Sequence, residues 1–155
     1  MIAEYVAQWT RHQRDLHRLC DFLDEFSARL PRLELSECEE AIRLLYMTLS
    51  STHAYEETKL FPALVMMSSQ VTTVLSTFRA HHREDRDEAL RIATLIMDAT
   101  IEDDGSAGRD LGICLPLFVR ALRRNVQFEE AICRALFAST KSAAECFDAP
   151  RRLAS

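Results

Sequence analysis

The stretch HAYEETKLFPAL, residues 53–64, lies inside a long apolar-periodic segment and carries one histidine and two carboxylates. Residues three and four apart on a helix lie on one face, so His53 can share a target with Glu56 or Glu57. Imidazole together with carboxylate suits iron, manganese or zinc, and non-haem iron is a leading candidate. The stretch therefore predicts a metal site, provided that other helices bring matching groups to the same depth.

Apolar residues recur every three or four positions along most of the chain, which is the pattern of helices that pack in a bundle. In the first segment, Trp9, Leu16 and Leu23 repeat at heptad spacing. Four such segments with short connections favour an all-α, up-down-up-down four-helix bundle. Their approximate ranges are 2–30, 36–67, 69–99 and 110–140.

Proline and capping residues mark the ends of the first two segments. Pro31 is expected to stop the first helix, and Ser36 with Glu39 forms a predicted capping box for the second. Tyr46 belongs to the apolar stripe expected for the second helix. Pro62 is expected to kink its last turns or to end the regular part.

The second half of the chain contains the clearest loop signal. Residues 101–109 hold two of the three glycines, and Asp110 is the expected cap of a fourth helix with Pro116 near its start. We expect residues 1–140 to form one domain, followed by a tail at 141–155 that contains at most a short helix.

Composition and charge narrow the functional class. The net charge of −5 argues against a nucleic-acid partner, and no apolar run reaches the length of a membrane span. The five cysteines are scattered without a C-x-x-C pair, which favours free thiols in a reducing cytoplasm. No nucleophile–base triad or Gly-rich phosphate loop is recognisable, so a binding protein is favoured over an enzyme.

Each predicted helix places a polar residue in its apolar stripe. These residues are His12, His53, His82 and Asn125, and Glu129 follows on the same face as Asn125. At about 1.5 Å per residue, the four lie within about one helical turn of the same depth. Buried polar groups need partners, and a metal ion satisfies several at once. The coincidence favours a metal site over a plain hydrogen-bonded network.

Other polar residues are placed by the same helical phase. Asp85 lies three residues beyond His82 on the same side, so we expect it to be a weak ligand or a support for one. His17, His81 and Glu130 lie off the stripes and are interpreted as surface residues.

Together these residues resemble the hemerythrin-like, or HHE cation-binding, family from about Tyr5 to Phe137. The family pattern is one His on helix 1, H-x-x-x-E followed by L-F-P on helix 2, His on helix 3, and H-x-x-x-E on helix 4. The corresponding stretches after helix 1 are residues 53–64, AHHREDRDEAL at 80–90 and RRNVQFEEAI at 123–132. The resemblance implies a bundle around a non-haem, usually di-iron, centre. The ligands it implies are His12, His53, Glu56, Glu57, His82 and Glu129.

Two features depart from the family pattern. Asn125 stands where the family has the His of helix 4, and an amide is a poorer ligand for iron, so a weak or supporting role is expected. Counting back from L-F-P places the helix 2 ligands on Glu56 and Thr52, whereas counting forward from His53 places the carboxylate on Glu57. One iron, two irons and a degenerate site therefore all stay open.

The resemblance implies a non-haem iron protein that senses or carries oxygen or another small ligand, or that handles iron and oxidative stress. The alternative is a degenerate, metal-free bundle that acts as a protein interaction or regulatory module, and Asn125 argues for it. A small ligand such as dioxygen is the expected partner, and a protein partner and the oligomeric state stay open.

Overall fold

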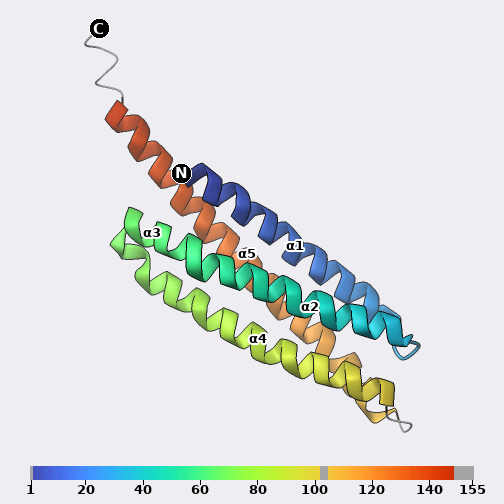
Figure 1. The fold of residues 1–155 in the computed structure, drawn as a ribbon. Helices are drawn as coiled ribbons and strands as arrows, with labels where there is room; N and C mark the ends of the chain where they lie inside the picture. Colours follow the sequence, from blue (N-terminus) through green and yellow to red (C-terminus); the bar gives the residue numbers. More distant parts are fainter. Residues whose placement is uncertain (1, 102–104, 149–155) are drawn as a thin grey trace.

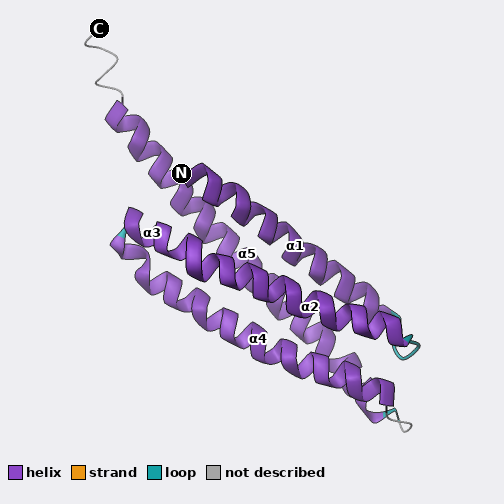
Figure 2. Ribbon diagram, in the orientation of Figure 1, coloured by secondary structure: helices purple, strands orange, loops and turns teal. Residues whose placement is uncertain are grey.

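A computed structural model describes the backbone of residues 2–101 and 105–148 and the side chains of residues 3–101 and 105–139. The chain is almost entirely helical within these ranges and contains no strand there (Figure 2). The elements are α1 (Ile2–Ala28), α2 (Leu35–Tyr55), the π-helix η1 (Glu56–Leu60), α3 (Phe61–Met67), the 3-10 helix η2 (Ser69–Val71), α4 (Thr72–Ile101) and α5 (Ser106–Asp148).

Four helical rods pack side by side, each antiparallel to the next in the chain (Figure 1). The second rod consists of α2, η1 and α3. Both α1 and α4 pack against α2 and against α5, so the rods close into a ring around a common interior. The predicted all-α, up-down-up-down four-helix bundle is confirmed.

The last rod is longer than expected. The α5 backbone continues without a break past Thr140 to Asp148 and projects beyond the N-terminal end of α1 (Figure 1). The rest of the expected tail, residues 149–155, lies outside the described residues. Among the described helices, none combines the length and the apolar character that crossing a membrane requires.

The bundle interior consists of two apolar cores separated by a polar layer. Leu23, Leu45, Ile92 and Leu115 belong to the first core, which includes the residues near the α1–α2 connection. Trp9, Leu60, Phe78 and Cys133 belong to the second core, near η1 and α3. The buried residues of the polar layer are Gln13, Thr52, His53, Glu56, His82, Asp85, Asn125 and Glu129. Because burial of unpaired polar groups is costly, this layer must satisfy its own members or a bound partner.

Helix α2 ends in a widened turn at η1. The Phe61 N–H donates to the Glu56 carbonyl, five residues earlier. Pro62 has no N–H, so the α-helical bond to the Thr58 carbonyl does not form. The Thr58 hydroxyl donates to the Ala54 carbonyl at 2.7 Å. The regular part of α2 therefore ends before Pro62, as predicted, and Glu56, the first residue of the widened turn, is buried in the polar layer.

The start of α2 corrects the expected capping box. Ser36 and Glu39 lie inside the helix, whereas Glu34 is the N-cap and Glu37 completes the box. The Glu34 N–H donates to Glu37 Oε2 at 3.1 Å. A carboxylate accepts hydrogen bonds from the first N–H groups of a helix as a hydroxyl does, so the helix begins earlier than Ser36 predicts.

Three further expectations are wrong in detail. Tyr46 is 69% exposed, because Leu45, one step round the helix, takes the core position. Asp110 lies inside α5, because that helix begins directly after Gly105, whose φ of 72° makes the turn. Pro116 consequently lies in the interior of α5 rather than near its start.

Candidate metal centre

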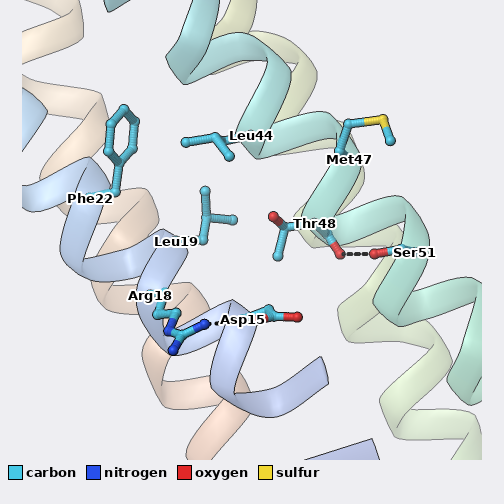
Figure 3. A pocket seen from close by; sticks show the side chains of 8 residues that line it. All are labelled: Asp15, Arg18, Leu19, Phe22, Leu44, Met47, Thr48 and Ser51. Atoms are coloured by element: carbon cyan, nitrogen blue, oxygen red, sulfur yellow. Dashed lines mark hydrogen bonds and ion pairs between the residues drawn. The ribbon is translucent and has the colours of Figure 1, made fainter. Parts of the chain in front are cut away.

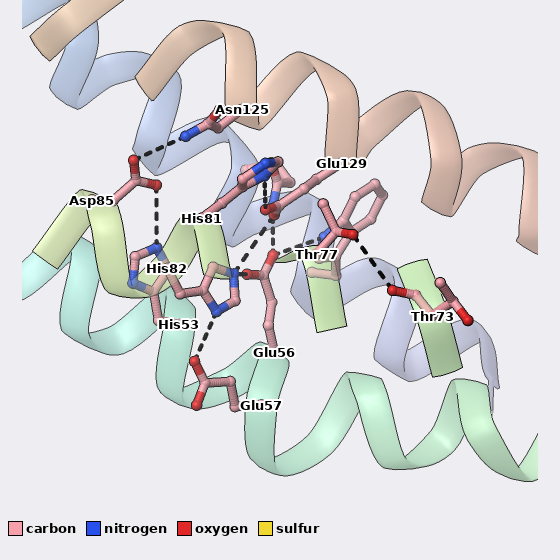
Figure 4. Close-up of polar contacts among 12 residues, drawn as sticks. His53, Glu56, Glu57, Thr73, Thr77, His81, His82, Asp85, Asn125 and Glu129 are labelled. Atoms are coloured by element: carbon pink, nitrogen blue, oxygen red, sulfur yellow. Dashed lines mark hydrogen bonds and ion pairs between the residues drawn. The ribbon is translucent and has the colours of Figure 1, made fainter. Parts of the chain in front are cut away.

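Three buried side chains from η1, α4 and α5 converge in the polar layer (Figure 4). Glu56, His82 and Glu129 each offer one ligand atom, and these atoms lie within 4.8 Å of one another. His82 Nε2 is 3.0 Å from Glu56 Oε2 and 3.7 Å from Glu129 Oε2. We call these three residues the acid–histidine cluster.

The orientation of His82 is fixed from several sides. Its Nδ1 lies 2.8 Å from Glu57 Oε1, so the Nδ1–H donates to that carboxylate and Nε2 faces the cluster. The ring also stacks on His53, with centroids 4.0 Å apart, and on Phe61, with centroids 5.6 Å apart. A carboxylate on the outer nitrogen is the usual arrangement behind a histidine that binds metal.

Two side chains of α1 donate hydrogen bonds to the Glu56 carboxylate. Its Oε1 accepts hydrogen bonds from Gln13 Nε2 at 2.7 Å and from Trp9 Nε1 at 3.1 Å. Its Oε2 has no hydrogen-bond partner among the described residues and faces His82. One oxygen is therefore anchored, and the other points into the cluster.

Glu129 has a neighbour on its outer side as well. Its Oε1 lies 3.8 Å from Nδ1 of His81, while its Oε2 faces His82. The ring of His81 packs edge-on against Phe128. His81 was expected at the surface, but its side chain is only 22% exposed, because Phe128 and Glu129 of α5 cover it.

A second group of polar residues flanks the cluster. Asp85 Oδ1 accepts a hydrogen bond from Asn125 Nδ2 at 3.0 Å, and Asp85 Oδ2 lies 4.0 Å from His53 Nε2. His53 Nδ1 and the Thr52 hydroxyl are buried without a hydrogen-bond partner among the described residues. The hydrogen-bonding groups of this flank are therefore only partly satisfied by one another.

The pKa values reflect burial of many acidic groups in one layer. Burial raises the pKa of Glu129, and it raises the pKa of Asp85 to about 6 despite the hydrogen bond from Asn125. Burial opposes the charged form of His82, but the Glu129 and Glu56 carboxylates outweigh it and raise its pKa to about 10. Burial, followed by the charges of His82 and Arg86, lowers the pKa of His53 to about 2.

These groups fit a divalent cation. Once the imidazole is neutral, as metal binding requires, the two carboxylates of the cluster leave buried negative charge that a cation would balance, and unbalanced buried charge is costly. Glu56 Oε2 and His82 Nε2 face each other but form no aligned hydrogen bond, although buried polar atoms normally have partners. A cation between them would satisfy both atoms. Oxygen and nitrogen donors together suit iron, manganese or zinc.

The structure places most of the predicted site residues in one layer. His53, Glu56, Glu57, His82, Asp85, Asn125 and Glu129 lie together at one level of the bundle (Figure 4). His12 is half-buried at the edge of α1, and its ring stacks on Tyr55 with centroids 4.8 Å apart. His12 as a ligand stays a prediction. His17 lies at the edge of the bundle and contacts Glu130 at 3.3 Å.

Three residues near the cluster were missed in the sequence. Trp9 and Gln13 of α1 contact Glu56, and His81 of α4 contacts Glu129. Gln13 follows Trp9 by four residues, but the neighbouring His12 fits the companion row of Tyr5 and Leu19 equally well, so the spacing did not single out Gln13. His81 had no signal in the spacing, because it lies off the apolar stripe of α4.

A groove between α1 and α2 lies apart from this chemistry (Figure 3). Its lining residues are Asp15, Arg18, Leu19, Phe22, Leu44, Met47, Thr48 and Ser51. Asp15 and Arg18 pair with each other at 3.6 Å, and the Ser51 hydroxyl donates to the Thr48 carbonyl. No residue of the polar layer lines this groove, so it does not extend the candidate site.

The four cysteines with described side chains, Cys20, Cys38, Cys114 and Cys133, are free, as predicted. Cys146 lies outside the described side chains. Burial raises the pKa of Cys20 to about 12, so its thiol stays protonated and is a poor metal ligand.

Comparison with protein families matches residues 5–136 to the family described as Hemerythrin HHE cation binding domain. The matched range includes the whole polar layer. No curated protein and no solved structure matches the chain.

Proposed function

The chain belongs to the hemerythrin HHE cation-binding domain family, and on this premise we propose that its polar layer binds a divalent metal cation, with iron as the first candidate. Glu56, His82 and Glu129 would hold the ion. Imidazole and carboxylate together suit ferrous iron, and the surrounding carboxylates favour a cation over a neutral guest. His12 and His53 remain predicted further ligands.

The observation that carries the proposal is the two-sided arrangement of the acid–histidine cluster. Each of the three side chains points one possible ligand atom into the cluster. Its other oxygen or nitrogen atom lies next to a residue outside the cluster. Trp9 and Gln13 contact Glu56. Glu57 binds His82, and His81 faces Glu129. Outer partners of this kind orient metal ligands and tune their basicity.

The proposed role of the bound ion is to sense or carry a small ligand such as dioxygen. Ferrous iron bound by these few protein groups would supply open positions for such a ligand. The protein's own contribution is exclusion of water and orientation of the ligands. Phe61 stacks on His82, and the two apolar cores enclose the polar layer from both ends.

One contact favours a second candidate function, a metal-free bundle that serves as an interaction module. Asn125 donates to Asp85 at 3.0 Å, so part of the polar layer is satisfied without a metal. In this case the charged His82 would take the place of the cation, and its raised pKa is consistent with that role.

Metal analysis of matched variants distinguishes the two functions. The test variants are Glu129→Gln and His82→Asn, and the controls are Glu130→Gln on the same helix and His17→Asn. We expect wild type and controls to retain ferrous iron after anaerobic loading and gel filtration. The test variants should bind more weakly than variants that lose only an outer partner, which typically costs roughly 10–100-fold, because each test variant loses a ligand that faces the ion. Wild type that retains no iron, manganese or zinc would contradict metal binding and support the interaction module.

A further inference from the structure

Glu56 receives both of its hydrogen bonds on one oxygen. Gln13 Nε2 lies 2.7 Å and Trp9 Nε1 lies 3.1 Å from Oε1. All three side chains are at most 2% exposed, so water does not substitute for either contact. Breaking one of these bonds would leave a buried N–H without a partner, which is costly.

The two donors fill the hydrogen-bonding capacity of Oε1. A carboxylate oxygen has about two lone-pair sites, and Gln13 and Trp9 each use one. Only Oε2 of Glu56 keeps its lone pairs, and it faces His82 Nε2 at 3.0 Å. Glu56 can therefore give one oxygen to a cation, but it cannot give one oxygen to each of two cations.

The neighbouring carboxylates keep oxygens on the flank of the cluster. Asp85 directs Oδ1 to Asn125 while its Oδ2 lies 4.0 Å from His53 Nε2, and the outer oxygen of Glu129 lies 3.8 Å from His81 Nδ1. Glu56, whose Oε1 is engaged by Trp9 and Gln13, supplies no oxygen that would join a second cation there to the first.

From these contacts we propose that Trp9 and Gln13 are positioning residues that restrict Glu56 to one oxygen, so that the centre binds one divalent cation per chain. The inference rests on the proposed cation-binding function and adds its stoichiometry and the residues that set it. Both residues act through Glu56 and need not touch the cation.

Variants that remove only the donors test this role. Trp9→Phe keeps an aromatic ring against Phe137, which contacts Trp9 at 5.6 Å between centroids, and removes the indole N–H. Gln13→Met keeps the length of the side chain and removes the amide. Gln8→Met is the matched control, because Gln8 is on the same helix and exposed.

The measurement is an anaerobic titration with ferrous iron, with cobalt(II) as a second probe, followed by infrared difference spectra of the carboxylate stretches. Wild type and Gln8→Met should saturate at one cation per chain, with the signature of one-oxygen carboxylate binding. The Trp9→Phe/Gln13→Met double variant should bind roughly 10–100-fold more weakly and show a change toward two-oxygen binding. A purely structural role for the two residues would not change the carboxylate signature.

The possible outcomes separate the inference from the proposed function. Wild type that binds two cations per chain overturns the inference and leaves cation binding intact, and so does an unchanged carboxylate signature in the double variant. Wild type that binds no cation overturns both. If the double variant does not fold, the inference is tested by the stoichiometry of wild type and by the carboxylate signature of the single Gln13→Met variant. Two cations per chain, or an unchanged signature, would overturn it.

Discussion

Cation binding should release a proton from His82. Without a cation, the Glu129 and Glu56 carboxylates hold the pKa of His82 near 10, so the ring is charged at neutral pH. A cation bound at Nε2 needs the neutral ring and therefore competes with this proton. Affinity should rise with pH for as long as the free centre is protonated.

The loss of cation affinity caused by the proton on His82 follows from the difference between the pH and the pKa. Each pH unit below the pKa costs about 1.4 kcal/mol, or a factor of about ten in affinity. At pH 7, three units below a pKa of about 10, the proton on His82 costs about 4 kcal/mol, or roughly a thousandfold in affinity. Between pH 6 and pH 8 the affinity should therefore rise about a hundredfold for one released proton. Burial raises the pKa of Glu129 as well, so the dependence should be steeper at the acid end.

Calorimetric titration with cobalt(II) in two buffers of different ionisation enthalpy counts the released protons. Nuclear magnetic resonance of the imidazole protons supplies a control within the same cation-free protein. His82 should stay charged up to pH 8, whereas His53, whose pKa burial lowers to about 2, should stay neutral down to pH 5. Affinity independent of pH, together with no released proton, would refute the reasoning.

Two further substitutions test the flank of the cluster. His53→Ala should lower metal content measured beside wild type, because it removes the ring stacked on His82, while His17→Ala at the edge of the bundle should not; equal metal content in wild type and His53→Ala would refute a role for this ring. Asn125→His should tighten ferrous binding in an anaerobic titration, because it adds an imidazole beside Asp85; a metal-free variant that loses roughly 1–3 kcal/mol of unfolding free energy would instead support the metal-free bundle.

The helical phase of single residues shows where sequence reasoning succeeded. Leu16, Leu23 and Leu45 repeat with the period of a helix, and they form the first core as expected. The level of His53 and His82 followed from the same period, because antiparallel rods with short connections bring equal distances from a turn side by side. The sequence therefore predicted which helices contribute to the acid–histidine cluster and at what depth in the bundle it lies.

Helical periodicity did not predict which residue at the edge of an apolar stripe points into the core. Neighbouring residues on a helix differ by about 100°, so His12 and Gln13 are nearly equal candidates for an inward position. Packing against α2 and α5 decided between them, and Gln13 contacts Glu56 while His12 stacks on Tyr55.

The amino-acid sequence by itself determined the all-α bundle, its four rods and the presence of a polar layer, because apolar periodicity is local and repeats along each helix. Only the tertiary structure decided which carboxylate enters the cluster. Helix α2 stays α-helical as far as Glu56, whose N–H donates to the Thr52 carbonyl, so both Glu56 and Glu57 lie near the face of His53 and helical phase alone does not choose between them. Packing against α4 directs Glu56, the residue reached by counting back from L-F-P, toward His82 Nε2 and leaves Glu57 to bind the opposite nitrogen of the same ring.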